Sequence, residues 1–525
     1  MLTKTKKNSS SPPHVLLLPP DRRSRSRSAT LSTAFVLFAS LLLSSAAWLS
    51  LVFHPSHHSP PLPHHRLLRS DHLSRLPFHP SLHQPPGRVP PTPLALNHLL
   101  FGIAGSSHLW DRRKEIVRLW WRPLEMRGHV WLEEPPRSLQ PPGAVDSSVN
   151  PTVGDDSGSL LPKIMVSDDT SRFRYTNPTG HPSGLRIARI IKESFHLGLD
   201  YVRWFVLGDD DTLFNVDNLV DVLAKYDWRE MVYVGSPSES HSANTYFSYN
   251  MAFGGGGIAV SYGLAKVVVE ILDDCLERYP KLYGSDDRLH ACISEIGVPL
   301  SREYGFHQWD IKGNPRGILS AHPIAPFISV HHLEAVDPFY PDLNLLEGLQ
   351  LFAKAMRMEP RSFLQRSMCY DHAHGLTFLV SLGYVIQVFP NVIYPRDLER
   401  SEQTYSAWNG INHRNEFDFD TRDPVKSLCK KPLLFYLKDV ERDGNATLGT
   451  YLRAGGTSDL RKRVFCFPRS PPLHNIENIQ VLGYPLDKNW HLAPRRMCCK
   501  IDHNDNSTLR LVVDQCRKGS LGSFF

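Results

Sequence analysis

In the middle of the chain, hydrophobic residues form short continuous runs in some segments and recur at helical spacing in others. Short apolar runs at 98–107 (HLLFGIAGSS), 128–134 (GHVWLEE) and 201–207 (YVRWFVL) predict buried strands. Apolar residues recur at helical spacing in 187–195 and again in 216–223, which predicts two amphipathic helices. Strands that alternate with helices are typical of an α/β domain with a mostly parallel sheet.

This alternation is confined to about 96–340, and we expect the α/β domain there. Residues 341–525 are less regular and contain six of the eight cysteines, so they are predicted to form a second, disulfide-braced region. The pattern leaves the fold of this C-terminal extension open. Residues 54–95 are rich in Pro and His and are predicted to form an extended stem.

An uncharged stretch at 31–53 follows a basic tail at 1–30. About twenty apolar residues suffice to cross a bilayer as a helix, and positive flanking charge stays on the cytoplasmic side. We therefore expect a signal anchor that leaves the rest of the chain in a lumen, as in a single-pass type II protein of the Golgi membrane. A cleaved signal peptide is the alternative.

Charge and cysteine usage agree with this placement. The net charge of +6 is modest and much of it lies in the basic tail, so we expect no nucleic-acid partner. All eight cysteines follow the predicted anchor, where an oxidising lumen would allow them to pair. Sequons at Asn445 and Asn506 lie in the same part of the chain.

Three aspartates, Asp209, Asp210 and Asp211, follow one of the predicted strands directly. Ligands of open α/β sheets bind outside the carboxyl ends of strands. Because residues i and i+2 of an extended chain point the same way, Asp209 and Asp211 are expected to share one side, with Asp210 opposed. Two carboxylates on one side suit Mn²⁺ or Mg²⁺, which would neutralise a leaving diphosphate. An acidic turn that caps the next helix is the alternative.

Four blocks occur in an order that resembles the Fringe-related β-1,3-glycosyltransferases of the GT-A fold. They are WFVLGDDDTLF (204–214), GGGGIAVS (254–261), YGSDDRLHACISEIGVPL (283–300) and ISVHHLE (328–334). The likeness is greatest to the plant Fringe-like branch filed as a domain of unknown function, which shares an FGIA…LW…WW opening and a Cys-containing C-terminal extension. It covers roughly 97–340 well.

The resemblance implies a metal and nucleotide-sugar site. Asp211 matches the direct metal ligand, Asp209 lies towards the ribose and the metal waters, and His331 completes the metal site. On an extended strand only one of two neighbouring histidines can reach it, and His332 is the second choice. By the residues alone, either histidine would be structural. Nucleotide-sugar contacts are further expected from two more aspartates, Asp168 and Asp210.

The same resemblance implies a catalytic base and an acceptor side. Asp287 is the first choice for the base and Asp286 the second, because an inverting transferase needs one carboxylate to take the acceptor proton. Both could instead simply favour a helix N-terminus. Arg288 departs from the commoner pattern, in which a small apolar residue follows. Acceptor contacts are expected from Gly255, Gly256, Gly257 and Trp309, whereas the tandem Trp120 and Trp121 are expected to pack in the core.

Together these features predict an inverting glycosyltransferase. It would move a hexose from a UDP-sugar to a hydroxyl of a glycan or glycoconjugate, with a β-1,3 linkage inherited from the resemblance and with Mn²⁺ or Mg²⁺. A lumenal sugar-binding or scaffold protein that keeps the GT-A fold without turnover is the main alternative. A metal-dependent phosphohydrolase is a weaker one, because the chain shows no evident nucleophile or second metal cluster.

Overall fold

In the computed structural model, the described part of the chain begins near the end of the predicted stem. The described residues are 92–139, 160–408, 410, 416–455, 463, 466, 476–504 and 508–516. The predicted tail, the predicted anchor at 31–53 and most of the predicted stem lie outside them. Within the described residues, no helix is both long enough and apolar enough to span a membrane.

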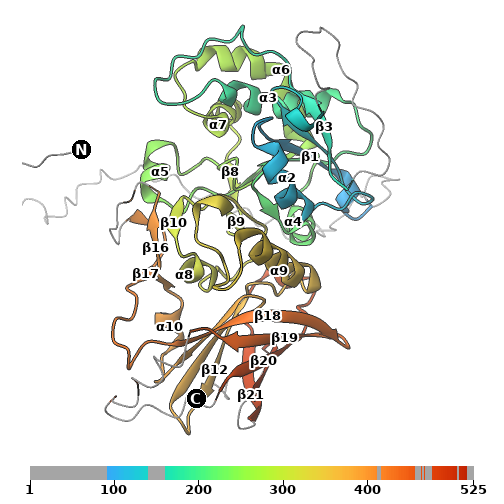
Figure 1. Cartoon of the computed structure of the whole chain (residues 1–525). Coiled ribbons are helices and arrows are strands. Elements are labelled where there is room, and N and C mark those ends of the chain that lie inside the picture. Colours follow the sequence, from blue (N-terminus) through green and yellow to red (C-terminus); the bar gives the residue numbers. More distant parts are fainter. Residues whose placement is uncertain are drawn as a thin grey trace, which may run out of the picture. The chain divides into compact units, whose positions relative to one another are not determined.

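A seven-stranded sheet organises the N-terminal half of the described chain (Figure 1). Its strand order is β3-β2-β1-β4-β7-β6-β8. The strands are β1 (Leu99–Ala104), β2 (Arg127–Leu132), β3 (Lys163–Val166), β4 (Trp204–Asp209), β6 (Tyr233–Gly235), β7 (Ile258–Ser261) and β8 (Leu300–Arg302). Only β7 runs antiparallel to its neighbours β4 and β6. The predicted α/β fold with a mostly parallel sheet is confirmed.

Helices cover both faces of this sheet. One face carries α3 (Ser183–His196), α6 (Tyr262–Arg278) and α7 (Ser285–Glu295), and the other carries α2 (Trp110–Arg118) and α4 (Val216–Leu223). Side chains alternate along each strand, so neighbouring residues of β1 and β4 enter different hydrophobic clusters on the two faces. Trp120 and Trp121 pack in the core behind α2, as predicted.

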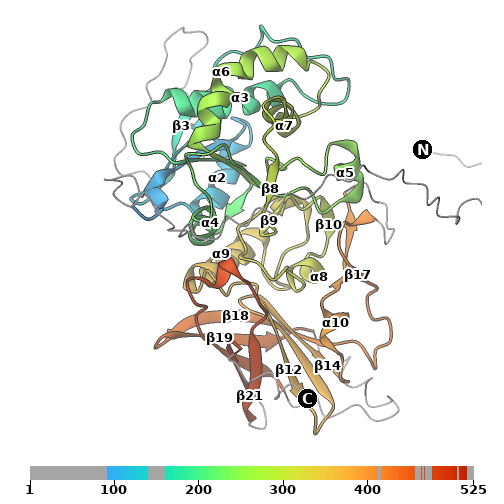
Figure 2. The same cartoon turned by 180° about the vertical axis from the view of Figure 1, so that it is seen from behind.

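The C-terminal extension is an eight-stranded, mostly antiparallel sheet in the order β12-β13-β14-β18-β19-β20-β22-β21. Its strands are β12 (Arg366–Asp371), β13 (Leu376–Ser381), β14 (Val385–Phe389), β18 (Leu433–Asp443), β19 (Ala446–Arg453), β20 (Asn478–Gly483), β21 (Cys498–Asn504) and β22 (Thr508–Asp514). The first and last strands, β12 and β21, also contact each other, so the sheet curls back on itself (Figure 2). The helix α9 (Leu345–Met358) packs against β18.

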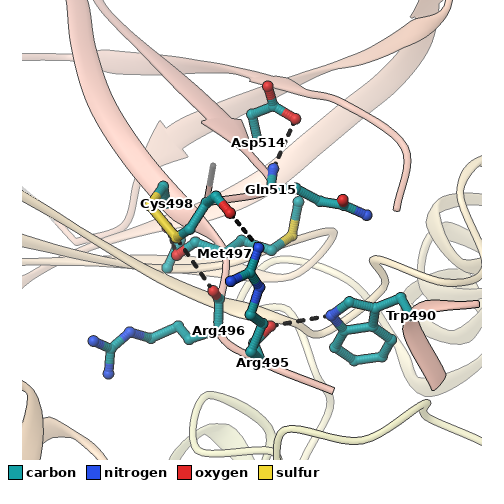
Figure 3. Close-up of a disulfide and its surroundings, with 9 residues drawn as sticks. Trp490, Arg495, Arg496, Met497, Cys498, Asp514 and Gln515 are labelled. Carbon is teal, nitrogen blue, oxygen red and sulfur yellow. Dashed lines mark hydrogen bonds between the residues drawn. A yellow bond between two sulfur atoms is a disulfide. The ribbon is translucent and has the colours of Figure 1, made fainter. Parts of the chain in front are cut away.

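Disulfides brace this extension, as predicted. Cys369 on β12 is bonded to Cys499 on β21, where the sheet closes. A second bond joins Cys498 to Cys516, beside the guanidinium of Arg495 and the backbone carbonyl of Arg496 (Figure 3). The other two bonds are Cys429–Cys466 and, between α6 and α7, Cys275–Cys292. All eight cysteines are therefore paired.

Short elements connect the two large sheets. A three-stranded sheet consists of β5 (Leu213–Phe214), β11 (Ser329–Val330) and β9 (Phe306–His307), and a two-stranded one of β10 (Ile311–Gly313) and β16 (Tyr405–Ala407). A further pair consists of β15 (Ser401–Glu402) and β17 (Thr421–Arg422). The other α-helices of the described residues are α5 (His241–Tyr246), α8 (Arg316–Leu319) and α10 (Pro395–Leu398). One hydrophobic cluster runs without interruption from β1 to β22.

Candidate metal centre and cavity

Asp209, Asp211 and His331 meet at the carboxyl end of β4. The Nε2 of His331 lies 3.0 Å from Oδ1 of Asp211 and 3.4 Å from Oδ2 of Asp209. One potential ligand atom of each residue lies within 4.8 Å of the others. The small sheet brings them together, because β11 pairs with β5, the strand that follows the aspartates directly. The structure thus assembles the three residues that the resemblance assigned to a metal.

The chemistry of this cluster fits a hard divalent cation. Asp211 is 3% exposed, and its Oδ1 has no hydrogen-bond donor in bonding geometry. Buried polar atoms are normally satisfied, so an orphaned carboxylate oxygen beside an imidazole indicates a missing partner. Carboxylate oxygens and a histidine nitrogen are ligands that Mn²⁺ accepts. The donor set therefore fits Mn²⁺ or Mg²⁺.

The pKa values of Asp209 and Asp211 also fit a site for a divalent cation. Burial raises the pKa of Asp209 well above its ordinary value, and the charges of the two following aspartates raise it further. Burial also acts to raise the pKa of Asp211, but the adjacent His331 and Arg113 outweigh it and bring that pKa to about 2. A dication at these oxygens would favour the ionised form of Asp209.

Arg113 on α2 offsets the charge of the middle aspartate. Its Nη1 lies 2.8 Å from Oδ1 of Asp210, and its Nη2 lies 3.0 Å from both Oδ2 of Asp211 and Oε2 of Glu334. Arg113 thus contacts both Asp210 and Asp211, and these two residues lie in a turn after β4, so the predicted alternation of an extended chain does not apply to them. Burial still raises the pKa of Asp210 to about 6. The sequence analysis missed Arg113, because an arginine in a charged helix resembles any solvated one.

A cavity of about 890 Å³ opens over the cluster. Small-molecule sites usually have volumes of about 300–1,000 Å³, so a nucleotide-sugar would fit. Its walls come from the carboxyl ends of β1 and β4, the start of α3, and the histidines after β11. They include Gly105, Ser106, His108, Glu133, His181 and Arg186 besides the three aspartates and His331. The cavity lies at the carboxyl ends of the strands, where the sequence analysis predicted a ligand site.

Of the two candidate bases, Asp286 faces the cluster. Asp286 and Asp209 line the same small cavity beside the metal ligands, and Oδ2 of Asp286 accepts a hydrogen bond from the Gly254 amide at 3.1 Å. Burial raises the pKa of Asp286. Asp287 instead turns back to the preceding loop, where its carboxylate accepts a hydrogen bond from the amide of Tyr283 at 3.3 Å. The structure therefore favours the second choice, Asp286, over the first.

Arg288, the departure from the resembled pattern, does not enter the cavity. Its side chain is fully buried, its guanidinium lies 4.8 Å from the centroid of the Tyr175 ring, and Nη1 donates to the Gly284 carbonyl at 2.9 Å. It thus packs at the start of α7.

The glycine run is closely packed against neighbouring residues, among them His331. Gly255, Gly256 and Gly257 are all buried. A Cβ on Gly255 would lie 2.2 Å from the His331 ring, and one on Gly256 would lie 3.1 Å from the backbone nitrogen of Gln308. Gly257 has φ +103°, which side chains rarely adopt. None of the three glycines lines the cavity, which speaks against the predicted acceptor contact, and Gly255 leaves room for the ring of His331.

Two other predicted contacts are also absent from the cavity. Trp309 is 1% exposed and packs against Phe339, with ring centroids 5.8 Å apart, so the prediction that it contacts the acceptor is wrong. Asp168 follows β3 but has a 70% exposed side chain directed at Arg189, at 3.5 Å, and does not line the cavity. A tryptophan in a loop and an aspartate after a strand do not show from sequence which way they point.

His332 and Trp408 form a feature that the sequence analysis missed. His332 has φ +54°, a left-handed conformation, so its ring does not point opposite to that of His331 as on a strand. The two imidazoles stack with centroids 3.9 Å apart, and Trp408 stacks on His332 at 4.4 Å. Trp408 belongs to the C-terminal extension and lines the same cavity.

Parts of this chain are similar to known proteins. A family described as a protein of unknown function, DUF604, matches residues 243–499. The human β-1,3-glucosyltransferase is 30% identical over 149 residues, which is 28% of this chain and 28% of that protein. The mouse β-1,3-glucosyltransferase is 30% identical over 137 residues, 26% of each. The chain thus spans little more than a quarter of the curated relatives that it matches.

A crystal structure of mouse xyloside xylosyltransferase 1 in the apo form also matches. It covers 38% of this chain and 80% of that one, with a TM-score of 0.24 and 9% identity. The two sequence matches show that just over a quarter of this chain is similar to β-1,3-glucosyltransferases. The closer likeness to Fringe enzymes and to their plant branch stays a prediction.

Proposed function

We propose that this chain is an inverting, metal-dependent glycosyltransferase of the GT-A fold that moves a hexose from a UDP-sugar to a hydroxyl of a glycan or glycoconjugate. The observation that carries the proposal is the cluster of Asp209, Asp211 and His331 on the wall of a cavity large enough for a nucleotide-sugar. The β-1,3 linkage is proposed from the two glucosyltransferase relatives.

Asp209, Asp211 and His331 would hold the Mn²⁺ or Mg²⁺ ion. When bound, such an ion neutralises the negative charge that develops on a departing diphosphate. Arg113 keeps Asp210 and one oxygen of Asp211 paired, so that the other oxygen of Asp211 remains available next to His331. The chain thus presents a fixed set of ligand atoms instead of a mobile acidic loop.

Asp286 would act as the general base. Its carboxylate takes the proton of the acceptor hydroxyl while the oxygen forms a bond to the anomeric carbon and the bond from that carbon to UDP breaks. Burial raises the pKa of Asp286, which makes its carboxylate a stronger base than an exposed aspartate. The amide of Gly254 fixes the position of the carboxylate.

We further propose that the protein is anchored in the Golgi membrane by the apolar stretch at 31–53, with the catalytic part in the lumen. The four disulfides support an oxidising compartment, because such bonds are rare in the cytosol. The basic tail before the stretch supports the type II orientation.

The test is release of UDP. The purified protein is incubated with Mn²⁺ and a panel of UDP-sugars, with and without candidate glycan acceptors. Wild-type protein should release UDP from at least one donor, and chelation of the metal should abolish the release. Asp211→Ala should lower the rate by roughly 100-fold or more, because it removes a metal ligand. Absence of UDP release from every donor with every acceptor would contradict the proposal.

A matched control is Asp217→Ala. Asp217 lies on α4, where its carboxylate accepts a hydrogen bond from Arg122 at 2.9 Å, and it does not line the cavity. This variant removes an aspartate from the same segment and should keep the wild-type rate. Equal losses in the two variants would indicate damage to the fold rather than to the metal site.

A further inference from the structure

Three aromatic rings form a continuous stack that starts at the candidate metal ligand. The imidazole of His331 lies 3.9 Å from that of His332, and the indole of Trp408 lies 4.4 Å beyond it, with interplanar angles of 30° and 21°. The His331 ring also abuts the Gly255 backbone on its way to the aspartates. The orientation of this ligand ring is therefore fixed by packing on both the glycine and the stack.

The outer end of the stack is supplied by the C-terminal extension. The strand β16 pairs with β10, and the amide of Trp408 continues this pairing by donating to the Asp310 carbonyl at 2.9 Å. The side chain of Asp310 lies 3.4 Å from Nδ1 of His332. The same two segments thus hold both the indole and the middle imidazole.

Trp408 is better suited to support the ring of His332 than to stack on a bound sugar. Although it is 42% exposed and lines the cavity, its ring already stacks on His332, and the ammonium of Lys312 lies 4.9 Å from its centroid. The chain itself therefore supplies this indole with one stacked ring and one nearby cation.

We infer that Trp408 is a positioning residue of the metal centre, through which the C-terminal extension completes the active site. The inference rests on the proposed function, and it adds a role for the extension. Outer-shell partners orient metal-ligating histidines, and their loss typically costs 10–100-fold in metal affinity. Without the indole, one face of the His332 ring would lose its support, and only the contacts of Nδ1 with Asp310 and with the Trp309 carbonyl would hold that ring against His331.

The test measures metal binding directly. Mn²⁺ is titrated into the purified protein, and the free ion is followed by electron paramagnetic resonance. We expect Trp408→Ala to weaken Mn²⁺ binding roughly 10–100-fold and Trp408→Phe, which keeps a stacking ring, to restore most of it. His332→Leu should cause a similar loss, and the double variant should lose little more than either single one, because both act through one stack.

The control is Trp228→Ala. Trp228 is also partly exposed and lies under a cation, Arg203 at 5.5 Å, but it does not line the cavity. It should bind Mn²⁺ like the wild type. Wild-type affinity in Trp408→Ala would overturn the inference while leaving the proposed function intact. No Mn²⁺ binding by wild-type protein would instead overturn the proposed metal site, and with it the inference.

Discussion

Arg113 forms a largely buried ion pair with Asp210. The Nη1 and Oδ1 atoms lie 2.8 Å apart, and the two side chains are 20% and 2% exposed. Two more carboxylates, those of Asp211 and Glu334, lie within 3.0 Å of the same guanidinium. These contacts raise the pKa of Arg113 although burial opposes the rise, so the arginine stays charged. A fixed internal cation therefore holds together the acidic turn after β4.

Replacement of Arg113 by Met should destabilise the fold. It would leave two buried carboxylates without a counter-charge, which typically costs about 3–5 kcal/mol. The free energy of unfolding from urea denaturation measures the effect. Asp210→Asn in the same chain should recover part of the loss, because it removes one of the two charges. Arg112→Met is the control: that side chain is 65% exposed, and the change should stay within about 0.5 kcal/mol.

The two adjacent aspartates of α7 should differ in their effect on catalysis. Asp286→Asn should lower kcat by roughly 10²–10⁴-fold, as expected for loss of a general base, whereas Asp287→Asn should retain much of the activity. The comparison needs only steady-state kinetics of UDP release with acceptor. A larger loss in Asp287→Asn would reverse the assignment and restore the choice that the sequence suggested.

The role proposed for Asp286 also predicts how the rate depends on pH. A base must be deprotonated to act, so the rate falls as the pH drops through its pKa. Because burial raises this pKa above the ordinary value of 3.8, the fall should begin at a higher pH than for an exposed aspartate. A profile of kcat/KM against pH reports the group in the free enzyme. A rate that stays constant down to pH 4 would contradict the role of Asp286.

The sequence predicted the large elements because their patterns are long. Strand β4 is a continuous apolar run, and helices α3 and α4 repeat apolar residues at helical spacing over two or more turns. Asn215 accepts the predicted capping bond from the amide of Asn218, at 3.3 Å. Two-residue strands have no such period. The small sheet that brings His331 to the aspartates was therefore invisible, and only the resemblance suggested the histidine.

Residues whose role depends on tertiary contacts were predicted poorly. Trp309 is chemically suited to stack on sugar, yet it lies in the core, while Trp408 in the extension lines the cavity. Asp286 and Asp287 open one helix, and which of them faces the metal ligands follows from where α7 packs against Gly254. The hydrophobic pattern of a segment predicts its secondary structure. Which of its side chains line the cavity or face the metal ligands depends instead on the other segments that it packs against.

Loss of the disulfide between β12 and β21 should weaken the C-terminal extension. Cys369 and Cys499 are 130 residues apart in sequence, and a bond that closes a loop of this length is worth up to about 5 kcal/mol through the entropy of the unfolded chain. The double variant Cys369→Ser/Cys499→Ser should lose about 2–5 kcal/mol. Hydrogen exchange should show that amides of β12 and β21 lose protection first. Unchanged protection there would show that the strand packing alone closes the sheet.

His129 on β2 should make the stability fall in acid. Burial, together with the charge of Lys163, which faces it in register on β3, lowers its pKa from 6.5 to about 4. Between pH 6.5 and 4 the unfolded chain therefore binds a proton that the folded chain does not, so the free energy of unfolding decreases as the pH falls through this window. Below pH 4 both states are protonated and the contribution of His129 is fully lost.

His129→Gln should remove about 1–3 kcal/mol of this pH dependence. The measurement is the free energy of unfolding at several pH values between 4 and 7, for both proteins. Lys163→Met should act in the opposite sense to burial, because it removes a nearby positive charge and lets the pKa of His129 move back towards 6.5. Identical slopes in wild type and His129→Gln would show that His129 is protonated as readily in the sheet as in the unfolded chain.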